Sequence, residues 1–88
     1  MTTIEAVAQA VGVAPEAVAR AGVLQDIAPD LSAQVRAGGL TLIEAEQANL
    51  RRQRSHYRRL TGDKQRAQDA LEGYENQLLR QRVALLAS

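Results

Sequence analysis

Residues 4–23 read IEAVAQAVGVAPEAVARAGV, and this stretch determines the fold that the sequence predicts. Its first half is an amphipathic segment that stops at Gly12, where a tight turn needs a positive φ. Its second half begins at Pro15, which suits a first helical turn because its missing N–H needs no partner there. Ala8 is the small residue expected where two helices cross. We therefore predict a helix-turn-helix, with a plain helical hairpin of a small bundle as the alternative. Its expected interior is aliphatic, at Ile4, Val7, Val11, Val13, Val18 and Ala21.

The rest of the chain is also predicted to be helical. Alanine, leucine, glutamine, glutamate and arginine dominate the sequence, and no segment shows the alternating pattern of a strand. A capping box at Thr41 and Glu44 opens a long helix. The shorter helices expected before it are Thr3–Val11, Pro15–Ala21, Val23–Ala28 and Asp30–Ala37, each followed by a glycine or a proline.

Thr61-Gly62-Asp63 decides how the second half folds. Gly62 suits a left-handed helix end and Asp63 suits the next N-cap, which favours an antiparallel hairpin of residues 41–61 and 64–87. The alternative is one helix through Gly62, at a cost of about 1 kcal/mol for an interior glycine. The predicted fold class is all-α, with a helix-turn-helix bundle over residues 1–40. A long C-terminal helix or helical hairpin follows over residues 41–88.

Charge is distributed unevenly along the chain. Residues 1–50 hold two basic and six acidic side chains, a net charge of −4, and residues 51–88 hold nine basic and four acidic, a net charge of +5. At about 100° per helical residue, six arginines share an arc of about 160°, opposite Leu50, Tyr57 and Leu60. These six form the predicted arginine stripe: Arg51, Arg52, Arg54, Arg58, Arg59 and Arg66. Arg66 belongs to it only if the helix continues through Gly62.

The arginine stripe favours binding to phosphates, which is tight, tolerant of sequence and sensitive to salt. Contact with an acidic protein surface is one alternative, and a solvated helix face is the other. Arg20 joins the expected nucleic-acid contacts as the one basic residue of the second helix of the helix-turn-helix.

The first half of the chain also resembles a known family. Residues 12–48 read GVAPEAVARAGVLQDIAPDLSAQVRAGGLTLIEAEQA. With the preceding helix, they are similar to the helix-turn-helix region of ParB-like and KorB-like partition proteins and related phage and plasmid regulators. The resemblance covers about residues 4–48 and implies an all-helical DNA-binding module that is often dimeric. The family's recognition helix usually opens with Ser or Thr and carries polar or basic residues, whereas residues 14–20 here hold Glu16 and only Arg20. The recognition helix is therefore expected to read bases poorly.

A seven-residue repeat in the second half predicts helix pairing. Its apolar seam is formed by Leu71, Tyr74, Leu78 and Leu85. The seam fits either the inside of an intramolecular hairpin or a homodimer interface, and both apply if the hairpin dimerises. A homodimer is also expected because so short a chain buries only about 60–65% of its unfolded surface and has no cysteine to form disulfides.

Enzymatic chemistry has no support in the sequence. There is no cysteine, the single histidine (His56) lacks a second ligand, and no phosphate loop or convergent acid–base set occurs, so no metal, cofactor or catalytic residue is expected. Neither a signal peptide nor a membrane span is expected, which predicts a cytoplasmic protein of a bacterial cell or a phage-infected host.

Two functions follow from these observations. The first is a non-catalytic regulator or a partition or packaging accessory of a bacterial mobile element or phage, acting on duplex DNA. The second is a phage-type module that binds a host protein complex and inhibits it, as an anti-defence protein does.

Overall fold

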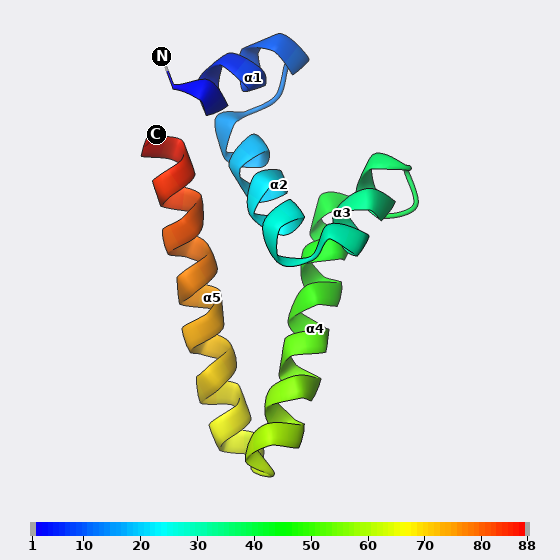
Figure 1. The fold of residues 1–88 in the computed structure, drawn as a ribbon, viewed down its shortest axis with the longest axis vertical. Coiled ribbons are helices and arrows are strands. Elements are labelled where there is room, and N and C mark those ends of the chain that lie inside the picture. The colour runs from blue at the N-terminus through cyan, green and yellow to red at the C-terminus, as the bar shows by residue number, and fades with distance from the viewer. Residues whose placement is uncertain (1, 88) are drawn as a thin grey trace.

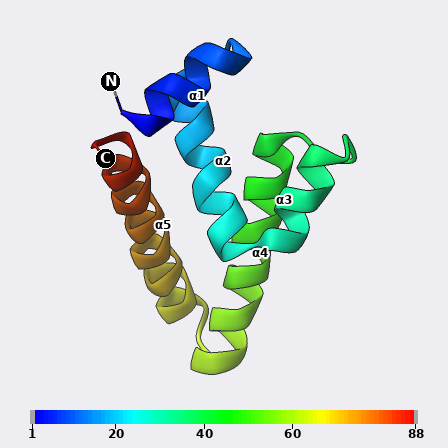
Figure 2. The same cartoon turned by 45° about the horizontal axis from the view of Figure 1, so that its top comes forward.

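The computed structural model describes residues 2–87, in which every regular element is a helix. The described helices are α1 (Thr3–Val11), α2 (Pro15–Ile27), α3 (Pro29–Arg36), α4 (Leu42–Thr61) and α5 (Lys64–Ala87). α4 and α5 meet at one end and diverge towards the other, and α2 lies between their diverging halves (Figure 1). The second view places α3 against the upper part of α4 and α1 across the start of α2 (Figure 2). The all-α prediction is confirmed.

The hairpin between α4 and α5 follows from capping residues that the sequence already showed. Gly62 ends α4 with a φ of 64°, and its N–H donates to the Arg58 carbonyl at 2.9 Å. Asp63 Oδ1 then accepts from the backbone N–H groups of Gln65 at 2.8 Å and Arg66 at 3.1 Å. These bonds use donors that the first turn of α5 would otherwise leave unpaired. The predicted break at residues 61–63 is confirmed.

The sequence prediction is wrong for α2. Two helices were expected there, and the structure has one helix, Pro15–Ile27. Gly22 lies inside α2 and does not end it. A Cβ built on Gly22 would lie 3.4 Å from Leu85 Cδ1, so this position of α2 faces α5. An interior glycine costs a helix about 1 kcal/mol, and α2 nevertheless continues because Ala19, Val23 and Leu24 are buried on either side of Gly22.

The main core cluster joins α2 and α3 to the start of α4. Leu24 and Ala28 pack with Leu31 and Ala45, each at most 3% exposed. A second contact joins the two long helices, where Leu71 of α5 is 1% exposed and Asn49 Nδ2 of α4 donates to the Tyr74 hydroxyl at 2.7 Å. The core therefore includes residues from both sides of position 40.

α1 departs from its predicted packing. It is bent by 109° from α2, and Ala8 is buried as expected. Val7, Val11 and Val13, however, are 44%, 63% and 47% exposed. Ala21 is exposed as well, and only Ile4 and Val18 are half-buried. The predicted interior is wrong at these exposed positions because α3 and α4 pack against the second half of α2, away from α1.

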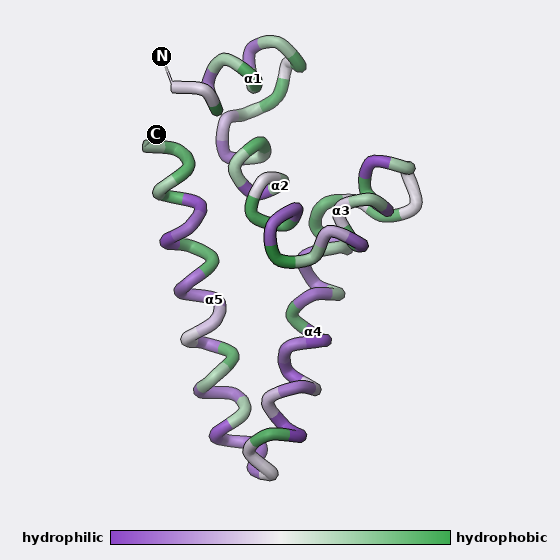
Figure 3. The backbone as a smooth tube through the Cα atoms, viewed as in Figure 1, coloured by the Kyte–Doolittle hydropathy of each residue, from purple (hydrophilic) through white to green (hydrophobic). Residues whose placement is uncertain are grey.

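Apolar residues occur along α1 and in the last turns of α5, whereas the half of α4 near the hairpin end is hydrophilic (Figure 3). Within residues 2–87, no single helix has both the length and the apolar character needed to cross a bilayer, and α1 and α2 reach that threshold only as a bent pair.

Candidate nucleic-acid interface

α4 has one face in the bundle and one face in solvent. Ala45 and Asn49 are buried against the other helices, and Tyr57 is half-buried on the same side. The five arginines of α4 are all exposed on the outer face, as their spacing predicted. They are Arg51, Arg52, Arg54, Arg58 and Arg59.

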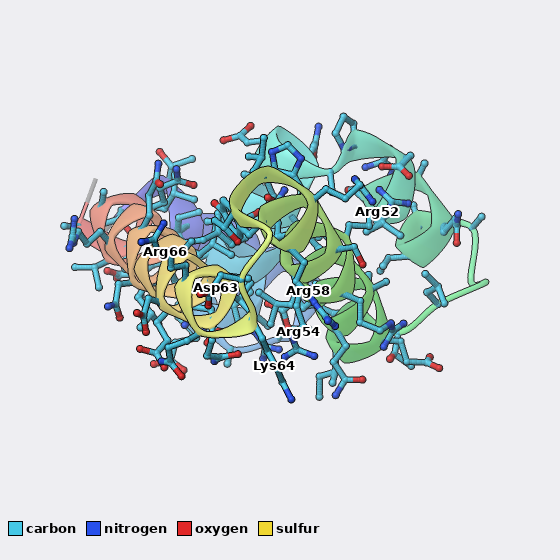
Figure 4. The ribbon with its side chains drawn as sticks, turned by 90° about the horizontal axis from the view of Figure 1, so that it is seen from below. Arg52, Arg54, Arg58, Asp63, Lys64 and Arg66 are labelled. Atoms are coloured by element: carbon cyan, nitrogen blue, oxygen red, sulfur yellow. The ribbon has the colours of Figure 1, made fainter. Side chains whose placement is uncertain are left out.

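Arg66 does not belong to this face. Its place in the predicted arc required a helix through Gly62, and α4 ends before that residue. Figure 4 shows Arg66 on the opposite side of α5 from Arg54 and Arg58. Lys64 lies on the same side of the hairpin as those two arginines (Figure 4). Lys64 was not among the expected contacts, and its side of the hairpin follows from how α5 packs against α4.

Arg52 is held by a carboxylate of α3. Its Nη1 donates to Asp30 Oδ1 at 3.1 Å and its Nη2 donates to Asp30 Oδ2 at 2.6 Å. The hydrogen bonds from Arg52 hold the pKa of the Asp30 carboxyl below its usual value and raise the pKa of Arg52. The two side chains are 51% and 56% exposed, and an exposed pair contributes little to stability. Arg52 is thus a partly neutralised member of the outer face.

Arg20 is also occupied, by a carboxylate of α4. Its Nε donates to Glu46 Oε2 at 3.1 Å, and its Nη2 forms a second bond with Glu46 Oε1. The hydrogen bonds to Glu46 raise the pKa of Arg20. Because Arg20 is the one basic residue of α2, and Glu16 and Asp26 are exposed on the same helix, α2 has no unpaired cation to offer a phosphate.

The remaining arginines of α4 have no ion-pair partner among residues 2–87. Arg51, Arg54 and Arg58 follow one another at spacings of three and four residues, which places them on one line along the helix. We call these three the arginine row. Lys64 extends it at the start of α5, and Arg59 lies on the other edge of the outer face. The hairpin end is therefore strongly positive.

The one acidic side chain of residues 51–66 does not neutralise the arginine row. Asp63 Oδ1 is bound to two backbone N–H groups at the start of α5. A carboxylate in this position is partly compensated by the positive end of the helix dipole. In the described part of the chain, no ion pair joins Asp63 to an arginine of α4.

His56 lies on the same exposed stretch of α4, with its ring centroid 5.7 Å from that of Tyr57. No group of three or more His, Cys, Asp or Glu residues that could hold a metal ion occurs within residues 2–87.

The predicted apolar seam packs within the chain. Leu71 is buried, Tyr74 accepts the hydrogen bond from Asn49, and Leu85 meets α2 at Gly22. Leu78 is half-buried and lines a groove between the helices. These contacts fit the interpretation of the seam as the inside of an intramolecular hairpin.

Comparison with protein-family models, with curated proteins and with solved structures gave no match to this chain. Its function is therefore inferred from its own residues.

Proposed function

We propose that this chain binds duplex DNA through the arginine row and Lys64, by neutralising backbone phosphates. The observation that supports this most strongly is the contrast between two groups of arginines. Arg20 and Arg52 are bound to carboxylates, whereas the arginine row is exposed without such a partner in the described range. Exposed guanidinium groups match the paired oxygens of phosphates, and releasing the counterions of DNA drives the association.

The proposed contact does not read base sequence through α2. A recognition helix needs polar or basic side chains that reach base edges. The exposed residues of α2 include Glu16 and Asp26, and Arg20 is tied to Glu46. We therefore expect two duplexes of unrelated sequence to bind with similar affinity.

The cellular role that fits this proposal is an accessory one. α1 and α2 are bent by 109°, within the range of about 90–120° that helix-turn-helix pairs adopt. Together with the resemblance of residues 4–48 to ParB-like and KorB-like regions, this bend supports a helix-turn-helix scaffold. We propose a non-catalytic regulator or a partition or packaging accessory of a bacterial mobile element or phage.

A second candidate function is an inhibitory module that binds a host protein complex. One observation favours it, namely three exposed valines, of which Val7 and Val11 belong to α1 and Val13 lies in the turn after it. A protein partner covers such a surface, whereas DNA does not use it.

Fluorescence anisotropy with a short labelled duplex tests the proposal. At about 50 mM salt we expect binding to two unrelated duplexes with affinities that agree within a few-fold. The variant Arg80→Ala controls for the loss of one positive charge and should bind like the unmodified chain, because Arg80 is an exposed cation of α5 far from the hairpin end. If neither duplex binds at this salt concentration, the DNA proposal is wrong and the protein-binding function is the candidate that remains.

A further inference from the structure

A groove of about 360 Å³ opens where α4 and α5 diverge. α2 closes the groove at the end away from the hairpin. The apolar residues that line the groove include Val23, Ile27, Leu50 and Leu78. Such a groove, with aliphatic residues from three helices, is the kind of surface that a helix of another molecule fills.

The rim of the groove is also apolar. Ile43 on the α4 side is 57% exposed, and Leu79 on the α5 side is 47% exposed. Val83, one turn beyond Leu79 on α5, is 63% exposed. Polar groups line the groove as well, namely the paired Arg20 and Glu46 and the side chains of Gln47 and Asn49. The exposed aliphatic residues beside them are of the kind that mark interfaces.

Two charged residues of α5 indicate what fits this surface. Glu75 and Arg82 both line the groove, and within residues 2–87 neither forms an ion pair. They lie seven residues apart on one face of α5, a rise of about 10 Å, and the midpoint between them falls at Leu78 and Leu79. When two copies of α5 pack antiparallel about a two-fold axis at that midpoint, Glu75 of each copy lies level with Arg82 of the other.

We propose that a second copy of this chain covers the groove, with the two α5 helices antiparallel and Leu79 of each next to the two-fold axis. The contact is isologous, so every residue of the surface is used twice. Leu79 and Val83 of one copy cover the apolar groove of the other, and two Glu75–Arg82 pairs flank them. Of the seam predicted from the sequence, only Leu78 lines this groove, whereas Leu71, Tyr74 and Leu85 pack inside the chain. It stands independently of DNA binding.

Molar mass in solution tests the interface directly. Light scattering over a range of concentrations is expected to give twice the 9.5 kDa of one chain. Leu79→Asp is expected to yield a monomer with unchanged helicity by circular dichroism. Leu60→Asp serves as the control, because Leu60 is even more exposed, at 69%, but lies at the hairpin end outside the groove.

Charge reversal tests the antiparallel register. Glu75→Arg and Arg82→Glu each place like charges opposite one another in the proposed homodimer, so each variant alone should associate at least about tenfold more weakly. An equimolar mixture of the two single variants restores both opposite-charge pairs and should form a heterodimer. The double variant, which exchanges the two charges, should dimerise like the unmodified chain.

Three results would each overturn this inference: a monomeric chain at every concentration, a dimer that survives Leu79→Asp, and a mixture of single variants that stays monomeric. None of these measurements involves nucleic acid. Failure of the interface is therefore distinguishable from failure of DNA binding.

Discussion

Replacing Arg54 and Arg58 with alanine removes half of the cations that we propose contact DNA. The contact consists of the arginine row and Lys64, four groups without an ion pair in the described range. Both replaced side chains are exposed, so the substitution changes the charge of the surface without opening a cavity in the core.

The magnitude follows from counterion release. Each neutralised phosphate contributes about 0.9 to the slope of log affinity against log salt concentration, so four contacts give a slope of about −3.6. Raising salt from about 50 to 200 mM then weakens binding about 150-fold. With two contacts left the slope is about −1.8, and the same change in salt weakens binding only about 12-fold.

Anisotropy titrations of one duplex at four salt concentrations measure this slope. The matched control is Arg36→Ala with Arg80→Ala, which removes the same total charge from two exposed positions away from the hairpin end. We expect the control to keep a slope of about −3.6. Equal slopes for the test variant and the unmodified chain, or an equal loss in the control, would refute a localised phosphate contact.

Three further predictions concern the scaffold. Gly62→Ala should destabilise the chain by about 1–2 kcal/mol in urea unfolding, because the φ of Gly62 is 64°. Gly73 lies inside α5 with no neighbouring atom within 4 Å, so Gly73→Ala should stabilise the chain by about 0.5–1 kcal/mol. The opposite order of stability would contradict the observed hairpin. Tyr74→Phe should cost about 1–3 kcal/mol, because the Asn49 amide, 3% exposed, loses its acceptor; an unchanged midpoint would exclude that bond. The folded-state pKa of Asp30 is lowered, so its contribution to stability is complete above the unfolded-state pKa of about 3.9 and is lost as pH falls through the lower folded-state pKa. The difference in stability from Asp30→Asn should therefore shrink in that window, and a difference that is constant with pH would contradict the ion pair.

Local signals in the sequence were sufficient for the second half of the chain. Gly62 ends α4 and its neighbour Asp63 caps the start of α5. Both act through hydrogen bonds with nearby backbone groups. Thr41 and Glu44 likewise form the expected capping box, with bonds of 2.9 and 3.1 Å. Features determined within four residues are readable from the sequence alone.

Features that depend on distant contacts were not readable. Gly22 has the appearance of a helix stop, but α2 continues through it, and Leu85, 63 positions later, lies against it. Arg20 appeared available for DNA, and the residue that occupies it, Glu46, lies 26 positions away. The exposure of Val11 depends on where α3 and α4 pack, which no local pattern in α1 specifies.

DNA binding at the hairpin end and the antiparallel contact of α5 together set the distance between the two cationic ends of the dimer. In the antiparallel dimer the hairpin ends point in opposite directions, each about 25 Å from the two-fold axis along α5. The cationic ends are then about 50 Å apart, farther than the 34–36 Å (about one DNA turn) that separates neighbouring half-sites. Such a dimer would bridge two duplex segments.

Backbone amide NMR shifts on addition of a short duplex at about 50 mM salt identify the helix that contacts the DNA. DNA binding through the arginine row should shift amides between Leu50 and Arg66 and leave those of residues 14–21 in place. Shifts concentrated in residues 14–21, with the hairpin end unchanged, would show that α2 meets the DNA and that the arginine row does not.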